Sequence, residues 1–181
     1  YNENGNIFKN TASGGTGTGA FKYSVAEGDA VTIDGDTGVL TILKAGTVVI
    51  EAIKEGDECY KESEPVQYTL VIELAEQKYY FEKGNSITLY YGTFEYVNTF
   101  LPVIKEDSAD GHGYGTGAII YSIEGDNTVG ATIDASTGVL KFDNSRDNVG
   151  TITISAKKSA DECYSEYTES YTIIVSFDSF T

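Results

Sequence analysis

Apolar and polar residues alternate along several short stretches of the chain, the pattern of β-strands with one buried face. The clearest cases are residues 47–53 and 151–157, and similar stretches lie at 40–42, 68–72, 140–142 and 171–175. Gly, Asp and Asn separate these stretches, and no helical period occurs between them. The pattern therefore predicts an all-β chain folded as antiparallel β-sandwiches.

The predicted strands occur in the same order twice. Residues 15–24 match 113–122 at seven of ten positions, 32–42 match 132–142 at seven of eleven, and 46–60 match 150–164 at nine of fifteen. The offset between the copies changes only in polar segments, where loops tolerate insertions. We expect two tandem copies of one domain, at residues 1–76 and 77–181.

The copies differ near their beginnings. Residues 87–92 supply a first strand to the second copy, whereas the first copy starts at Tyr1 and lacks that strand. The second copy carries an extra loop at about residues 101–110. An unpaired edge in the first copy would invite strand addition from another chain, and residues 176–181 are a candidate donor.

Three repeated motifs give the chain a resemblance to a known family. They are GGTGTGA at residues 14–20, IDGDTGVL at 33–40 and the DECY that ends the 46–60 block. The chain resembles the immunoglobulin-like tandem repeats of large bacterial cell-surface proteins and adhesins. The resemblance implies two immunoglobulin-like sandwiches, an extracellular location and a structural or adhesive role, although the cysteine in DECY departs from the polar residue expected there.

Charge excludes several partners. The chain has 28 Asp+Glu against 12 Lys+Arg, a formal net charge of −16. Such a charge repels nucleic acid and anionic membranes. No stretch approaches the roughly 20 apolar residues of a membrane span, and no segment reads as a signal peptide. Because the 181 residues contain no Met, we expect a piece of a longer protein.

Two repeated motifs could suggest ligands. Asp34 and Asp36, with Asp134 in the second copy, could suggest calcium, but the spacing favours a hairpin in which Asp34 or Asp134 binds backbone N–H groups. The glycines at 15, 17, 19, 113, 115 and 117 resemble a phosphate loop superficially. A strand rather than a helix follows them, so we expect a close backbone approach instead.

One cysteine lies in each copy, Cys59 and Cys163. Equivalent points in a linear tandem array lie roughly one domain length apart, too far for a disulfide, which needs Cα atoms within about 7 Å. Two interpretations stay open: a small, partly buried thiol in a turn, or a thiol that forms a bridge between chains.

The extra loop holds the acids Glu106, Asp107 and Asp110 and the single histidine, His112. Its simplest interpretation is a solvated loop, and its alternative is a calcium or ligand contact. Tyrosines that recur at matched positions are expected in the core or at corners. The aromatic residues left for a surface or interface role include Tyr79, Tyr80, Phe81 and Tyr114.

No spacing assembles a nucleophile with a base, so we expect no enzyme. The leading hypothesis is a non-catalytic structural or adhesive module that contacts adjacent repeats or copies of itself. The alternatives are a filament subunit completed by strand donation and a carbohydrate-binding module. Surface glycans or a host-cell protein are further possible partners. No cofactor is required, and calcium is the one metal considered.

Overall fold

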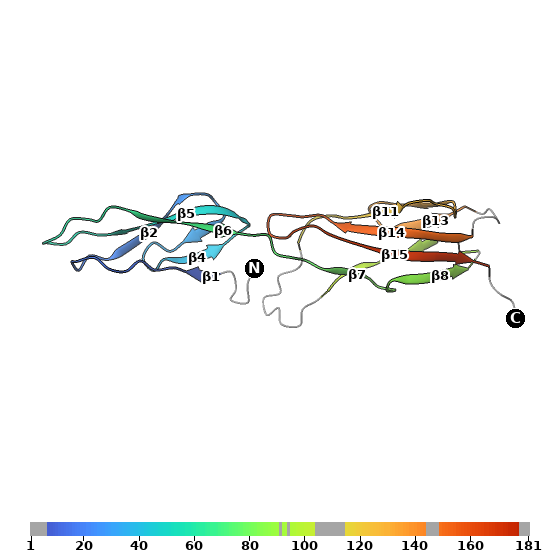
Figure 1. Cartoon of the computed structure of the whole chain (residues 1–181), viewed down its shortest axis with the longest axis horizontal. Coiled ribbons are helices and arrows are strands. Elements are labelled where there is room, and N and C mark those ends of the chain that lie inside the picture. Colours follow the sequence, from blue (N-terminus) through green and yellow to red (C-terminus); the bar gives the residue numbers. More distant parts are fainter. Residues whose placement is uncertain (1–6, 91, 94, 104–114, 144–148, 178–181) are drawn as a thin grey trace. The chain divides into compact units, whose positions relative to one another are not determined.

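The pairing of short strands defines two separate units. The computed structural model describes residues 7–90, 92–93, 95–103, 115–143 and 149–177 (Figure 1). Strands are the only regular elements of these residues, which confirms the all-β prediction. None of the described residues forms a helix that could cross a membrane. The chain divides into unit 1, Tyr1–Ala75, and unit 2, Glu76–Thr181.

Unit 1 contains two three-stranded sheets that share one core. Their orders are β1-β4-β3 and β2-β5-β6. Because the strands alternate apolar and polar residues, each sheet buries one face. The buried residues are Ala30, Val31, Leu40, Val48 and Ile50. The strand bounds are β1 Ile7–Lys9, β2 Phe21–Glu27, β3 Val31–Ile33, β4 Val39–Ile42, β5 Gly46–Lys54 and β6 Val66–Ile72.

Unit 2 repeats this sandwich and enlarges it. Its sheets have the orders β12-β13-β9, β11-β14-β15-β8 and β10-β7. Buried residues of all three sheets form one core cluster, which joins them into one sandwich. The strand bounds are β7 Tyr79–Phe81, β8 Ser86–Tyr90, β9 Glu95–Val97, β10 Phe100–Pro102, β11 Ile119–Glu124, β12 Ala131–Ile133, β13 Val139–Phe142, β14 Gly150–Lys158 and β15 Tyr167–Ser176.

Pairing of equivalent strands relates the two units. The order β2-β5-β6 of unit 1 corresponds to β11-β14-β15 of unit 2, and β1-β4-β3 corresponds to β9-β13-β12. Strands β7, β8 and β10 have no counterpart among residues 7–75. Within the part of the chain that the structure describes, unit 2 thus has three strands beyond those of unit 1.

One strand pair departs from the antiparallel arrangement. β8 lies along β15 in parallel register, with Ile87 opposite Ile173 and Leu89 opposite Val175 (Figure 1). All other described strand pairs are antiparallel. The antiparallel sandwich prediction is thus confirmed, with one parallel edge that alternation alone could not reveal, because both directions share a period of two.

Candidate functional site

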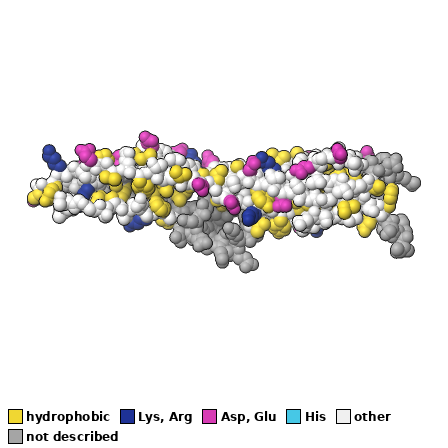
Figure 2. All heavy atoms as spheres, in the orientation of Figure 1, with side chains coloured by type: hydrophobic (Ala, Val, Ile, Leu, Met, Phe, Trp, Pro, Cys, Tyr) yellow, Lys and Arg dark blue, Asp and Glu magenta, His cyan; other side chains and the backbone are white. Residues whose placement is uncertain are grey.

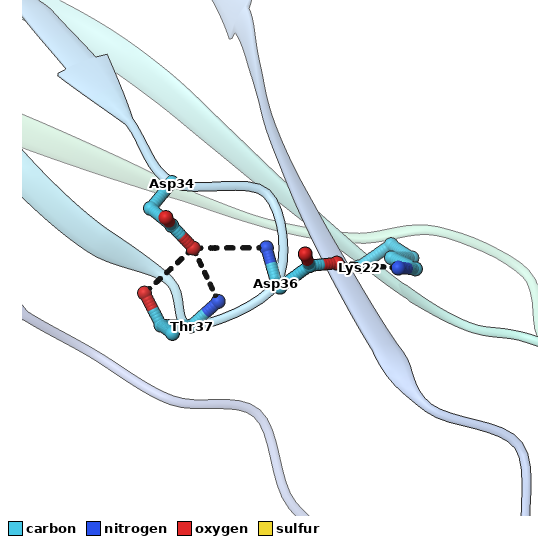
Figure 3. Close-up of polar contacts among 4 residues, drawn as sticks. All are labelled: Lys22, Asp34, Asp36 and Thr37. Carbon is cyan, nitrogen blue, oxygen red and sulfur yellow. Dashed lines mark hydrogen bonds and ion pairs between the residues drawn. The ribbon is translucent and has the colours of Figure 1, made fainter.

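The acidic turn between β3 and β4 is a closed hairpin. Asp34 Oδ1 accepts hydrogen bonds from the backbone N–H of Asp36 at 3.1 Å and of Thr37 at 2.8 Å, and from the Thr37 hydroxyl at 2.7 Å (Figure 3). Hydrogen bonding by Thr37, through its hydroxyl and then its backbone, lowers the Asp34 pKa. Asp36 pairs with Lys22 of β2. The Asp34 carboxylate therefore organises the turn, and the hairpin interpretation is confirmed.

The second copy of this turn has the same geometry. Asp134 Oδ1 accepts the backbone N–H of Ser136 at 2.9 Å and of Thr137 at 2.8 Å. The side-chain hydrogen bond from Ser136, with those from Thr137, lowers the Asp134 pKa to about 2. Gly138, at φ +71°, ends the turn in a conformation that L side chains rarely adopt. This copy has Ser136 where the first has Asp36. The turn does not need an acid at that position, because backbone N–H groups already bind the Asp134 carboxylate.

The two glycine-rich segments lie against the backbone of the turns that follow β5 and β14. A Cβ at Gly19 would lie 1.8 Å from the Glu55 carbonyl oxygen, and one at Gly117 would lie 2.1 Å from that of Ser159. Any side chain at these two positions would force the backbones apart. The prediction of a close approach is confirmed, and the segments precede strands β2 and β11 rather than helices.

The aspartate of each DECY motif joins its turn to the glycine-rich segment by hydrogen bonds. The sequence did not reveal this role. Asp57 Oδ2 accepts the Thr18 backbone N–H at 2.5 Å, while its Oδ1 accepts those of Cys59 and Tyr60, each at 2.9 Å. These hydrogen bonds, that from Thr18 first, lower the Asp57 pKa to about 2. The sequence signal for this contact was that both copies contain a GTG motif and a DECY motif.

Asp161 makes the equivalent contacts in unit 2. Its carboxylate accepts backbone N–H groups of Thr116 at 2.5 Å, Cys163 at 2.9 Å and Tyr164 at 2.8 Å. Burial opposes ionisation of Asp161, but these hydrogen bonds outweigh it, so its pKa is lowered.

The cysteines occupy these two Asp-centred turns. The structure shows both as thiols, Cys59 exposed and Cys163 partly exposed. A bridge between chains through Cys59 stays a prediction.

The residues predicted for a metal or ligand in the extra loop lie outside the described residues. These are Glu106, Asp107, Asp110, His112 and Tyr114. Within the described ranges, no group of three or more His, Cys, Asp or Glu side chains could hold a metal ion. Acidic side chains are instead scattered over the visible face (Figure 2).

The aromatic segment at the start of unit 2 is mostly core. Tyr79 and Phe81 are 5% and 4% exposed, which corrects the expectation that they were left for a surface role. Their rings pack on Phe100, with centroids 5.2 and 5.0 Å away. Only Tyr80, on the opposite face of β7, is exposed. Alternation along β7 explains why neighbouring aromatic residues have opposite environments.

Residues 77–90 therefore cover one side of unit 2, and we name them the cover segment. Gln77 is buried and donates from Nε2 to the Ser165 carbonyl at 2.5 Å. The Lys158 ammonium lies 5.7 Å from the centre of the Tyr79 ring. Further along, Ile87 and Leu89 pack against the core.

A buried hydrogen-bond network lies beneath this cover. The Tyr171 hydroxyl donates to Asn98 Oδ1, and Asn98 Nδ2 donates to the Gly138 carbonyl at 2.6 Å. Asn98 and Tyr171 are each 3% exposed. Burial raises the Tyr171 pKa, and the neighbouring Tyr96 adds to this effect.

Unit 1 presents the same surface without a cover among its described residues. Tyr68, Leu70 and Ile72 of β6 are partly exposed, whereas their equivalents Tyr171, Ile173 and Val175 are buried. In the described sheet, β6 pairs with β5 alone. An edge strand of this kind offers unpaired N–H and C=O groups to an added strand.

The network beneath the cover is also incomplete in unit 1. Asn10, which aligns with Asn98, is exposed. The Tyr68 hydroxyl oxygen is buried and has no hydrogen-bond partner within the described residues. Burial raises the Tyr68 pKa, and the approach of the Asn10 side chain only partly opposes this. The edge of β6 with Tyr68, Leu70 and Ile72 is therefore the candidate interface of the molecule.

Comparison with known proteins gives only weak likenesses. No protein-family model matches the chain, and the comparison with curated proteins found no match. Repeats EC22-24 of mouse cadherin-23 align at 17% identity and a TM-score of 0.35, over 86% of this chain and 52% of that one. Repeats EC1-3 of Drosophila N-cadherin align at 12% identity and a TM-score of 0.37, over 87% and 55%.

Human protocadherin-24 EC1-2 aligns at 12% identity and a TM-score of 0.36, over 89% of this chain and 83% of that one. This chain thus spans about half the length of the first two solved chains. Likenesses this weak carry no inference about function. The sandwich assignment rests on the strand pairing and the cores of the two units themselves.

Proposed function

We propose that the chain is a non-catalytic structural or adhesive module of an extracellular protein, built from tandem β-sandwich repeats that resist tension. The observation that carries the proposal is the parallel pairing of β8 with β15. The chain enters unit 2 just before β7 and leaves it after β15. A pull on its two ends therefore loads β8 and β15 in shear, so that their backbone hydrogen bonds must break together.

Force spectroscopy on the full chain tests this proposal. We expect two unfolding events, with released lengths of roughly 25 and 35 nm from the extended length of about 3.5 Å per residue. The longer step, from unit 2, should require the higher force, because unit 1 has no described pairing between its first and last strands. A longer step at the lower force would contradict the proposal.

A matched pair of variants isolates the β8–β15 contact. Replacement of the inward-facing Ile87 and Leu89 by Ala should lower the force of the longer step and leave the shorter one unchanged. Replacement of the outward-facing Thr88 and Tyr90 by Ala should change neither, because both side chains are exposed. Equal effects of the two pairs would show that side-chain packing of β8 does not set the mechanical resistance.

The bacterial-surface context comes from the resemblance of the repeat motifs. Binding to neighbouring repeats, to a cell-surface protein or to glycans belongs to the same proposal. Calcium is a further part of it, through acids of the extra loop. A melting temperature that does not change on addition of millimolar calcium would remove calcium from the proposal.

A second candidate is a filament subunit completed by strand donation from a neighbouring chain. The observation that favours it is that β6 pairs with β5 alone among the described strands. A carbohydrate-binding module has no comparable support among the described residues.

A further inference from the structure

One hairpin in each unit contacts the edge strand of the other sheet. The hairpins join β3 to β4 in unit 1 and β12 to β13 in unit 2, and the edge strands are β2 and β11. We propose that each hairpin acts as an edge guard, which occupies the middle of the edge strand and prevents a second copy of this chain from pairing with it. The proposal concerns self-association and does not depend on the adhesive role.

The edge strand of unit 2 shows what the hairpin closes. β11 ends the described sheet β11-β14-β15-β8 and pairs there with β14 alone. Tyr121 turns its N–H away from β14, and the period of two places Ile119 and Ile123 on the same side. Backbone groups that face outward along an edge strand pair readily with an added strand, so an unguarded β11 would favour association.

The first support is a backbone hydrogen bond that both units contain. The Tyr121 N–H donates to the Ala135 carbonyl at 2.9 Å, and the equivalent Tyr23 N–H donates to the Gly35 carbonyl at 2.9 Å. A regular antiparallel partner would need this same N–H, because its ladder uses every second residue of the edge strand. The hairpin therefore competes directly with an added strand.

The second support is that the hairpin also packs on the ring of the same tyrosine. A Cβ at Gly38 would lie 3.1 Å from the Tyr23 ring, and one at Gly138 would lie 2.9 Å from the Tyr121 ring. Both glycines have a positive φ, so the space and the backbone conformation each require glycine. Each hairpin thus contacts the backbone and the ring of one central residue of its edge strand.

The Lys22–Asp36 ion pair beside this contact is not essential to it. In unit 1, Lys22 of β2 pairs with Asp36 of the hairpin (Figure 3). Unit 2 has Ile120 and Ser136 at these positions and keeps the hydrogen bond from Tyr121. The backbone contact is therefore the shared feature, and the aspartate at the start of each hairpin fixes the shape that this contact requires.

The test removes the carboxylate that shapes each hairpin. In the full chain, Asp34→Ala and Asp134→Ala together should loosen both hairpins. At low protein concentration we expect the Tyr23 and Tyr121 amides to exchange with solvent about tenfold faster than in the unaltered chain. Light scattering should then show that the variant associates as its concentration rises to about 1 mM, whereas the unaltered chain does not.

The other Asp-centred turn of each unit provides the matched control. Asp57→Ala and Asp161→Ala also remove carboxylates that accept backbone N–H groups, but these bind the glycine-rich segments instead. The control variant should neither speed exchange at Tyr23 and Tyr121 nor associate. Equal association of the two variants would show that general destabilisation is the cause and would overturn the proposal.

Amide exchange at high concentration identifies the surface that associates. Pairing through the freed edge of unit 2 should slow exchange at Ile119, Tyr121 and Ile123 as the concentration of the hairpin variant rises. Association that leaves these amides unchanged would overturn the proposal, and so would fast exchange at Tyr121 without association. If the double variant does not fold, Thr37→Val gives the same comparison at β2, because it removes only the hydroxyl hydrogen bond to Asp34.

Discussion

Unit 1 and unit 2 bury their equivalent residues to different extents. Leu40 of β4 and Leu140 of the equivalent strand β13 are both fully buried. Burial differs between the equivalent strands β15 and β6. Ile173 of β15 is fully buried, whereas Leu70 of β6 is partly exposed. The difference follows from β7, β8 and β10, which only unit 2 has among the described strands. A repeat can thus keep its core residues and still need an added segment to bury them.

The largest effect is expected at a buried residue of β7, a strand that only unit 2 has among the described residues. Phe81→Ala should lower the free energy of unfolding of unit 2 by about 3–5 kcal/mol, because a buried ring leaves a cavity. Chemical denaturation, followed by signals from each unit, measures the loss. Tyr80→Ala is the matched control, since Tyr80 is 46% exposed and its loss should cost less than about 0.5 kcal/mol. Equal losses would show that β7 is not anchored by its inner face.

The two equivalent leucines sharpen the comparison. Leu140→Ala and Leu40→Ala should each cost about 2–5 kcal/mol, with the larger cost in unit 2. Both side chains are fully buried, but unit 1 has an open sheet edge and can relax around the cavity more readily. Urea denaturation of the two variants gives the difference. A larger cost for Leu40→Ala would mean that unit 1 is the more rigid unit.

The tyrosine pair separates a complete network from an incomplete one. Tyr171→Phe should destabilise unit 2 by about 1–3 kcal/mol, because Asn98 Oδ1 loses its buried donor. Tyr68→Phe should be neutral or slightly stabilising, because no hydrogen-bond partner of that hydroxyl is found in the described part of the chain. Thermal unfolding of the two variants measures both effects. A clear loss from Tyr68→Phe would show that Asn10 already completes the network in unit 1.

The smallest effect is expected from acid. The pKa values of Asp57 and Asp134 are lowered to about 2 in the folded chain, from an ordinary value of 3.8. A carboxyl group with a lowered folded pKa stabilises the fold above its unfolded pKa and loses this contribution as pH falls. Stability should therefore decrease between about pH 4 and pH 2. Asp57→Asn and Asp134→Asn should weaken that pH dependence, and an unchanged profile would exclude these carboxylates as its cause.

Much of the fold could be predicted from the repeat. Matched alternation at 47–53 and 151–157 located β5 and β14, and the repeated IDxxTG motif gave the Asp-centred hairpins. Alternation could not give the direction of β8, since parallel and antiparallel strands share it. Local sequence also could not show that Asp57 bonds to Thr18, 39 residues away.

The aromatic residues show a second limit of sequence reasoning. Tyr79, Tyr80 and Phe81 look alike as a run, yet only the middle one is exposed. Their alternation was a usable signal, but its phase depends on which neighbours the strand meets. The candidate interface was suggested by the strand missing from the first copy, and its residues became visible only when the burial of the two units was compared.

Amide hydrogen exchange of the full chain, measured residue by residue, tests the central comparison most directly. If β6 is an open edge, about half of the amides between Thr69 and Ile72 should exchange rapidly, because alternate N–H groups face away from β5. The amides between Thr172 and Val175 should all be slow, since β15 has a partner on each side. Equal protection of both stretches at low protein concentration would contradict the account.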